Sequence, residues 1–189
     1  MIADLNAAPG GKASHISQLM GSTGKVVAMD RTKSKISQVA TTAIRLGCKN
    51  IHPTIQDTRY VDVDHPSLKP DRCLVDPPCT SLGVTPKLFD YTSELDVEHL
   101  AEYQRQFLRS ASKILRRGKI LVYSVCTVTW EECEEIAAYA EDECKLELVE
   151  QKPLIGDPGL TSHPHRNLLQ RFHPHKHGIG YFIAKFAKR

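Results

Sequence analysis

The residues that decide the fold read MIADLNAAPGGK, positions 1–12, where a short apolar run passes through a Pro-Gly-Gly turn into a helical pattern. We expect a strand over Met1 to Leu5 and a helix over Lys12 to Met20. In such a turn, backbone N–H groups and a helix N-terminus face a ligand, and glycines let the ligand come close. The stretch matches neither G-x-G-x-x-G nor G-x-x-x-x-G-K-[ST], which weakens a dinucleotide-binding or ATPase interpretation. It predicts a site for a nucleotide-like cofactor.

Short apolar runs and longer helical patterns alternate along the rest of the chain. Further strands are expected at residues 25–29, 50–55, 72–75, 119–124, 146–149 and 181–186. Helices are expected at 32–46, 97–116 and 131–143, and a long loop at 77–92. The alternation is typical of βαβ units with a mostly parallel sheet. We therefore expect an α/β fold with helices on both faces of the sheet, built as one domain over residues 1–189.

The composition is that of an ordinary globular protein, with 41% hydrophobic and 25% charged residues. No apolar run approaches the roughly 20 residues that a membrane span needs, and the N-terminus lacks a secretory pattern. The six cysteines form no C-x-x-C pair, so the spacing of a zinc ribbon is absent. We expect reduced thiols and a cytoplasmic location.

The part of the chain from Gln151 onward is basic and rich in histidine. It contains seven Lys/Arg residues against one acidic residue, Asp157, and five of the nine histidines. A basic end suits a phosphate backbone, although a solvated surface explains the charge equally well. The H-x-H spacings at His163, His165, His173, His175 and His177 could chelate zinc. Because prolines separate the pairs and no cysteine lies nearby, we expect an exposed loop and no metal.

Acidic residues follow the second and third expected strands. Asp30 ends the second strand, where a carboxylate typically accepts hydrogen bonds from ribose hydroxyls, and Asp57 follows the third, within reach of an adenine edge. Taken one at a time, the glycine turn could be an ordinary turn, and Asp30 and Asp57 could each be solvated surface residues. Their order at successive strand ends favours an adenosine-type cofactor.

Two cysteines also follow expected strands, in the motifs Asp76-Pro77-Pro78-Cys79 and Ser124-Val125-Cys126-Thr127. In an open α/β sheet such strand ends gather at one crevice. A thiolate there can add to an electron-poor ring carbon, provided that a base or a lowered pKa activates it. Lys12 could supply the cationic neighbour. The other four cysteines, at positions 48, 73, 133 and 144, lack such motifs and are interpreted as small buried hydrophobes.

Together these motifs, with Arg171-x-x-Pro174 and the run Gly180-Tyr181-Phe182-Ile183-Ala184, resemble the Sun family of RNA cytosine-5 methyltransferases. The resemblance implies a Rossmann-like class I methyltransferase fold and S-adenosylmethionine as cofactor. It implies that Cys126 adds to C6 of cytosine, that Cys79 aids product release, and that Asp76 and Lys12 stabilise charge on the ring. It also implies a cofactor site formed by Ala7, Ala8, Pro9, Gly10, Gly11, Lys12, Asp30, Arg31, Lys35, Asp57 and Asp76.

The same resemblance implies an RNA partner, with tRNA favoured over rRNA, and no membrane partner. Basic residues of the tail and Lys87 in the long loop are expected to contact phosphates. The sequence departs from the family pattern at Asn6, where a cysteine or small residue is common, and at Cys133, where asparagine is usual. Family members normally carry N-terminal helices and often a separate RNA-binding domain, and neither is found in this sequence. We expect a partner or an N-terminal segment to help capture RNA.

Two other functions remain open on the sequence. A DNA cytosine-5 methyltransferase would use Cys79 as its nucleophile, which leaves Cys126 without a role and the chain without room for a DNA-recognition domain. A non-catalytic module that binds RNA or a partner protein would keep only the fold.

Overall fold

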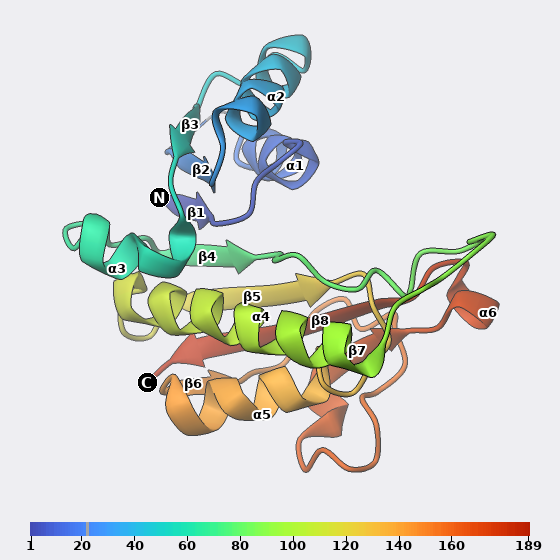
Figure 1. Cartoon of the computed structure of the whole chain (residues 1–189). Helices are drawn as coiled ribbons and strands as arrows, with labels where there is room; N and C mark the ends of the chain where they lie inside the picture. The colour runs from blue at the N-terminus through green and yellow to red at the C-terminus, as the bar shows by residue number, and fades with distance from the viewer. Residues whose placement is uncertain (22) are drawn as a thin grey trace.

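The computed structural model describes residues 1–21 and 23–189, and within them one sheet lies at the centre (Figure 1). Its strands are β1 (Ile2–Asp4), β2 (Val26–Asp30), β3 (Ile51–Ile55), β4 (Arg72–Val75), β5 (Ile120–Val125), β6 (Leu146–Leu148), β7 (Leu169–Phe172) and β8 (Tyr181–Lys188). Their order is β3-β2-β1-β4-β5-β8-β6, and β7 also pairs with β8. The strands from β3 to β5 run parallel, whereas β8 runs antiparallel to β5, β6 and β7. The expected mostly parallel sheet is confirmed.

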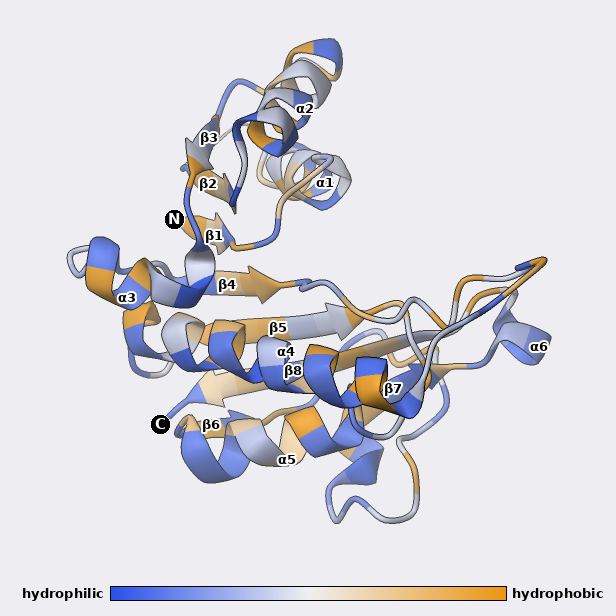
Figure 2. Cartoon of the chain, in the orientation of Figure 1, coloured by the Kyte–Doolittle hydropathy of each residue, from blue (hydrophilic) through white to orange (hydrophobic). Residues whose placement is uncertain are grey.

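Helices cover both faces of this sheet. They are α1 (Gly11–Leu19), α2 (Lys33–Arg45), α3 (Val61–Asp64), α4 (Glu94–Ile114), α5 (Glu134–Glu143) and α6 (Pro174–His177), with 3-10 turns at Thr58–Tyr60 and Arg166–Leu168. Successive side chains of a strand point to opposite faces. Accordingly, Val26 and Ala28 of β2 pack in one core with α1 and α2, while Val27 and Met29 pack in a second core with α4 and α5. Figure 2 shows the apolar strands between helices with hydrophilic outer faces.

The helix α4 begins three residues before the expected start at Val97. Ser93 accepts a hydrogen bond from the backbone of Asp96, and the Asp96 carboxylate accepts one in return from the backbone of Ser93. This reciprocal capping satisfies backbone donors that the first turn of a helix otherwise leaves unpaired. The cap therefore fixes the point at which the long loop after β4 ends.

The helix α5 begins at Glu134 and not at Glu131, where the acidic run predicted its start. Glu132, one of the two residues between them, lies in the preceding turn, and its side chain is fully buried. A buried carboxylate needs hydrogen-bond donors, and the donors around Glu132 come from the loops that carry the two motif cysteines. The helix therefore begins later than predicted, because Glu132 is buried in the turn that precedes it.

One strand, β7, is absent from the sequence-based expectation. It reads Leu169-Gln170-Arg171-Phe172 and pairs antiparallel with β8. Its two central side chains are polar and buried. Gln170 hydrogen-bonds to Gln151, and Arg171 hydrogen-bonds to Glu134. Buried polar side chains of this kind hide the apolar signature of a strand.

The carboxyl ends of β1, β4 and β5 meet at one edge of the sheet, beside the N-terminus of α1 (Figure 1). The glycine turn follows β1, and the two cysteine motifs follow β4 and β5. The fold therefore brings the three sequence motifs to one place. Among the described residues, no helix combines the length and the apolar character needed to cross a membrane.

Candidate active site

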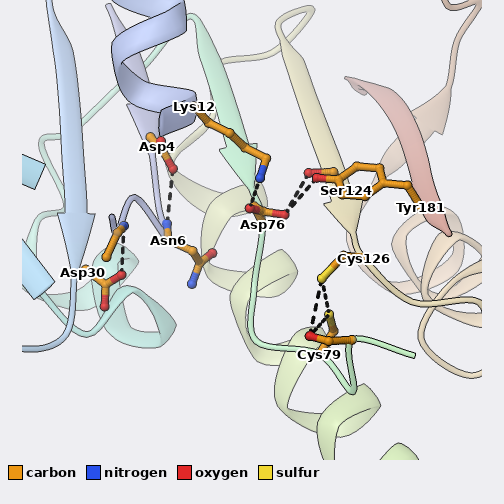
Figure 3. A network of polar contacts seen from close by, with 11 residues as sticks. Asp4, Asn6, Lys12, Asp30, Asp76, Cys79, Ser124, Cys126 and Tyr181 are labelled. Carbon is orange, nitrogen blue, oxygen red and sulfur yellow. Dashed lines mark hydrogen bonds and ion pairs between the residues drawn. The ribbon is translucent and has the colours of Figure 1, made fainter. Parts of the chain in front are cut away.

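The two motif cysteines face each other across the ends of β4 and β5 (Figure 3). The Sγ atoms of Cys79 and Cys126 lie 3.4 Å apart, within hydrogen-bond distance for sulfur. Neither is paired in a disulfide, and both are partly exposed. The structure thus brings together two residues that stand 47 positions apart in the chain, as the sequence predicts.

The carboxylate of Glu132 fixes the two cysteine-bearing loops against each other. Thr80, which follows Cys79, donates its backbone N–H and its hydroxyl to this carboxylate at 3.0 and 2.5 Å. Thr127, which follows Cys126, donates its hydroxyl at 3.0 Å. Further donors are the hydroxyl of Thr129 at 3.1 Å and the side-chain amide of Gln104 at 2.8 Å. Sequence reasoning missed Glu132, because a glutamate in an acidic run gives no sign that it is buried.

The thiols of the pair differ in acidity. A hydrogen bond from Cys79 lowers the pKa of Cys126 from 9.0 to about 6, against the effect of partial burial, and a hydrogen bond with Ser81 lowers it further. The pKa of Cys79 is raised, first by its hydrogen bond to Cys126 and then by burial. At neutral pH the pair therefore holds a thiolate at Cys126 and a protonated thiol at Cys79. A thiolate is the form of cysteine that acts as a nucleophile.

Asp76 stands beside the cysteines and is held by three side chains (Figure 3). Lys12 donates to its Oδ2 at 2.5 Å, while Ser124 and Tyr181 donate to its Oδ1 at 3.1 and 3.3 Å. Burial disfavours the charge on Lys12, but the hydrogen bond and the attraction to Asp76 raise its pKa above the ordinary value.

Lys12 is therefore the partner of Asp76. We expected Lys12 to be the cation that activates Cys126, but hydrogen bonds with Cys79 and Ser81 lower the pKa of Cys126 instead. Ser124 and Tyr181 were not predicted as site residues, although both stand inside motifs that the sequence shows. Their hydroxyls aim the Asp76 carboxylate into the crevice between the strand ends.

The glycine turn forms one wall of a recess of about 220 Å³ beside Asp76. The residues that line it are Asn6, Ala7, Ala8, Pro9, Gly11, Lys12 and Asp76. Gly10 lies behind the recess with a φ of 110°, and a Cβ there would come within 3.2 Å of the backbone of Val39. Glycine is therefore required at Gly10 by both torsion and packing. The recess contains most of the residues predicted to hold the amino-acid end of a cofactor.

A narrower recess of about 60 Å³ lies on the other side of Asn6 and contains the remaining predicted residues, Asp30, Arg31, Lys35 and Asp57. The Asp30 carboxylate accepts hydrogen bonds from the backbone N–H groups of Ala8 and Arg31 and pairs with Lys35 at 3.1 Å. It therefore braces the glycine turn as well as lining the recess. Asp57 is engaged by the guanidinium of Arg59 at 2.9 and 2.5 Å, and this pairing lowers the pKa of Asp57.

Two buried oxygen atoms near these recesses test whether a polar cofactor fits. The Oδ2 atom of Asp4 and the Oδ1 atom of Asn6 have no hydrogen-bond partner among the described residues. Burial raises the pKa of Asp4 to about 7. A buried acceptor such as the Asn6 oxygen is normally satisfied, so the site fits a ligand that brings a donor to Asn6, which lines both recesses.

A pair of glycines ties the crevice to the C-terminal part of the chain. The backbone N–H of Gly83 donates to the carbonyl of Cys126 at 3.0 Å, and that of Gly180 donates to the carbonyl of Gly83 at 2.7 Å. A Cβ on Gly83 would lie 2.2 Å from the Gly180 oxygen, so the two backbones touch directly. The C-terminal motif therefore supports the loop that carries the nucleophile candidate.

The basic tail differs in part from the expectation. Arg171 is buried in an ion pair with Glu134 and donates to the carbonyl of Val128 at 2.7 Å, so it cannot contact phosphate and instead holds the loop after Cys126. Lys87, which lies in the long loop after β4 and was also expected to contact phosphate, forms an ion pair with Asp90 at 2.9 Å.

The tail histidines match the expected exposed loop only in part, because His165 and His175 are exposed whereas His163 is buried. His163 is only 1% exposed. Within residues 1–21 and 23–189, no group of three His, Cys, Asp or Glu side chains is arranged to hold a metal.

Known proteins share this arrangement over nearly the whole chain. The family model described as 16S rRNA methyltransferase RsmB/F matches residues 1–187. A tRNA (cytosine(72)-C(5))-methyltransferase of Pyrococcus horikoshii is 42% identical over 191 residues, which cover 100% of this chain and 47% of that protein. A 28S rRNA (cytosine-C(5))-methyltransferase of Mus musculus is 34% identical over 201 residues, or 99% of this chain and 25% of that protein.

The crystal structure of NSun6 from Pyrococcus horikoshii with SFG superimposes with a TM-score of 0.93 at 41% identity, covering 100% of this chain and 47% of that one. The Rossmann-like methyltransferase fold expected from the motifs is thereby confirmed. The chain spans about half the length of its archaeal relative. With its fold, its motif order and its family match in agreement, the chain belongs to the RsmB/F, or Sun, family of RNA cytosine-5 methyltransferases.

Proposed function

We propose that this chain is the catalytic part of an RNA cytosine-5 methyltransferase that uses S-adenosylmethionine. The observation that carries the proposal is the pair of sulfur atoms 3.4 Å apart, one lowered and one raised in pKa, beside the Asp76 carboxylate. A nucleophilic thiolate, a second thiol that can assist its release and a hydrogen-bonding carboxyl group suit substitution at cytosine C5.

In this proposal the Cys126 thiolate forms a bond to C6 of a cytosine that has left its stack. The electron pair of the C5–C6 double bond moves toward C5 and into the ring. Asp76, held by Lys12, Ser124 and Tyr181, would accept a hydrogen bond from the exocyclic amine at the ring edge, and the ammonium of Lys12 would stabilise the negative charge that develops on the ring. Because these partners fix the carboxyl group beforehand, little reorganisation is needed during the reaction.

The bond between Cys126 and C6 must break again to release the product. A water molecule takes the proton from C5, the electrons of that C–H bond restore the C5–C6 double bond, and the C6–S electron pair returns to the Cys126 sulfur. The protonated thiol of Cys79 lies within hydrogen-bond distance of that sulfur and stabilises the returning thiolate. This is the release role proposed for Cys79.

The cofactor site proposed here comprises the two recesses on either side of Asn6. S-adenosylmethionine bound there would supply an electrophilic methyl group to C5. The glycine turn and Lys12 would hold the amino-acid end, while Asp30, Arg31, Lys35 and Asp57 would hold the nucleoside. Asn6 lines both recesses and would contact the bound cofactor from between them.

We propose tRNA in preference to rRNA as the substrate, because the archaeal relative with 42% identity is named for tRNA. The proposed location is the cytoplasm, where thiols stay reduced. The alternative of a DNA methyltransferase with Cys79 as nucleophile is disfavoured, because it leaves Cys126 without a role although its sulfur lies 3.4 Å from that of Cys79.

The test compares wild type, Cys126→Ala and Cys79→Ala with S-adenosylmethionine and either tRNA or rRNA. Methyl transfer and denaturant-resistant protein–RNA adducts are both measured. We expect Cys126→Ala to abolish both signals and Cys79→Ala to accumulate adduct. The reverse pattern would move the nucleophile to Cys79, and cofactor binding without either signal in wild type would favour a binding module.

A further inference from the structure

Ser81 has a backbone conformation that its side chain does not favour. Its φ is 57°, and among the described residues only Ser81 and Lys145 are non-glycine residues with positive φ. The left-handed region is costly for a residue with a Cβ and is usually occupied by glycine. Strained residues persist where the surrounding structure holds them, and they cluster at active sites. Ser81 follows Cys79 by two positions, in the loop that leads away from β4.

The strained backbone places the Ser81 hydroxyl against both sulfur atoms. Its Oγ lies 3.4 Å from the Cys126 Sγ and 3.7 Å from the Cys79 Sγ, and the two sulfurs are themselves 3.4 Å apart. The carbonyl of Ser81 accepts a hydrogen bond from Val84, and Gly83 donates to the carbonyl of Cys126. The turn is thus tied to the nucleophile by backbone as well as side chain.

We infer that Ser81 is a further catalytic group of this site, whose hydroxyl donates a hydrogen bond to the Cys126 thiolate. This inference rests on the proposed function, in which Cys126 is the nucleophile. A serine hydroxyl can turn its hydrogen to suit its partner. It accepts from the Cys126 thiol while that is protonated and donates to the sulfur once the proton is lost.

The charges around Cys126 explain why a neutral donor is needed there. The Asp76 carboxylate, at the end of β4, raises the pKa of Cys126. The ammonium of Lys12 from α1 and the hydroxyl of Tyr181 from β8 are both directed to Asp76. The thiolate therefore depends on Cys79 and Ser81, which are the neighbours that lower its pKa through hydrogen bonds.

Two substitutions separate the hydroxyl from the strain. Ser81→Gly removes the hydroxyl and relieves the strained φ, whereas Ser81→Ala removes the hydroxyl and keeps the strain. The readout is the pH dependence of Cys126 alkylation by iodoacetamide, with Cys126 and Cys79 distinguished by peptide mass spectrometry. No RNA or cofactor is present, so the result does not depend on methyl transfer.

We expect both variants to raise the alkylation midpoint of Cys126 by about one to two pH units, which corresponds to losing a hydrogen bond to a charged group. We also expect the melting temperature to rise in Ser81→Gly relative to Ser81→Ala. A midpoint in Ser81→Gly equal to that of wild type would overturn the catalytic role of Ser81. Absence of methyl transfer in wild type, with the midpoint shifted as expected in both variants, would instead contradict the proposed function and leave the hydrogen bond established.

Discussion

Thr80 gives both its backbone N–H and its hydroxyl to the carboxylate of Glu132, at 3.0 and 2.5 Å. Because Thr127 binds the same carboxylate, the residues that follow Cys79 and Cys126 share one anchor. The distance between the two sulfurs is therefore set by a side chain that touches neither of them.

Replacing Glu132 by glutamine should separate these loops, since an amide offers one acceptor oxygen where the carboxylate offers two. We expect methyl transfer to fall by about 10²-fold through misplacement of the reacting atoms. Stability should fall by about 1–3 kcal/mol as buried donors lose partners. Affinity for S-adenosylmethionine, measured by calorimetry, should stay within about threefold, because the recesses lie elsewhere.

Glu135→Gln is the matched control for this variant, because Glu135 lies three residues further on, in the first turn of α5, and pairs with Arg105 near the surface. Such an exposed pair contributes little. Equal losses of methyl transfer in the two variants would show that Glu132 has no special part in placing the cysteines.

The reactivity of Cys126 should depend on pH in a defined direction. With a pKa lowered to about 6, the thiolate is the minor form at pH 5 and the major form at pH 7. The rate of Cys126 alkylation in wild type should therefore rise between these values and level off above about pH 7. A rate that keeps rising to pH 9 would mean that the thiol is not activated.

Replacing Asp76 by asparagine should weaken the stabilisation of charge on the cytosine ring. We expect methyl transfer to fall by about 10²-fold, as for loss of an oriented electrostatic partner. Tyr181→Phe removes one hydrogen bond to that carboxylate and should cost no more than about tenfold. Steady-state rates with saturating RNA compare the two, and a larger loss in Tyr181→Phe would contradict the assigned order of importance.

Asp4 should make the stability of the protein depend on pH. Its pKa is raised from 3.8 to about 7, so the folded state binds a proton that the unfolded state has already released between these values. The stability that Asp4 contributes is complete below pH 3.8 and is lost as pH rises through 7. The difference of three units corresponds to about 4 kcal/mol.

The substitution Asp4→Asn should remove that slope, and urea unfolding at pH 5, 6, 7 and 8 measures it. Identical slopes in wild type and variant would show that Asp4 is ionised in the folded protein throughout this range.

Enlarging Gly180 should disturb the nucleophile loop from a distance. A Cβ at Gly180 would approach the Cα of Gly83 and the Cγ1 of Val128 to 2.6 Å. We expect Gly180→Ala to lower both the melting temperature and the yield of the RNA adduct. Gly178→Asn serves as control, because Gly178 has a φ of 80° with open space around it, and asparagine tolerates such a torsion. Equal adduct yields in the two variants would count against a supporting role for the glycine contact.

The sequence predicts the site best where chain geometry follows from strand order. It predicts that Cys79, Cys126 and Asp76 lie together, because the carboxyl ends of parallel strands meet at one edge of a sheet. Glu132 could not be predicted as part of the site, since a solvated glutamate and a buried one look alike in a sequence. Ser81 was missed because its role depends on one backbone torsion, and β7 because Gln170 and Arg171 have buried partners from distant segments.

The position of β8 also bears on how the protein is made. Strands β6 and β7 precede β8 in the chain, and both pair with β8. During synthesis their edges stay open until β8 has left the ribosome, and open edges of this kind invite pairing with other chains. The same delay applies to the contact between Gly180 and Gly83, so the loop beside Cys126 gains its support late. In a nascent chain of this protein, the part of the sheet that completes the active site is therefore the last to be paired.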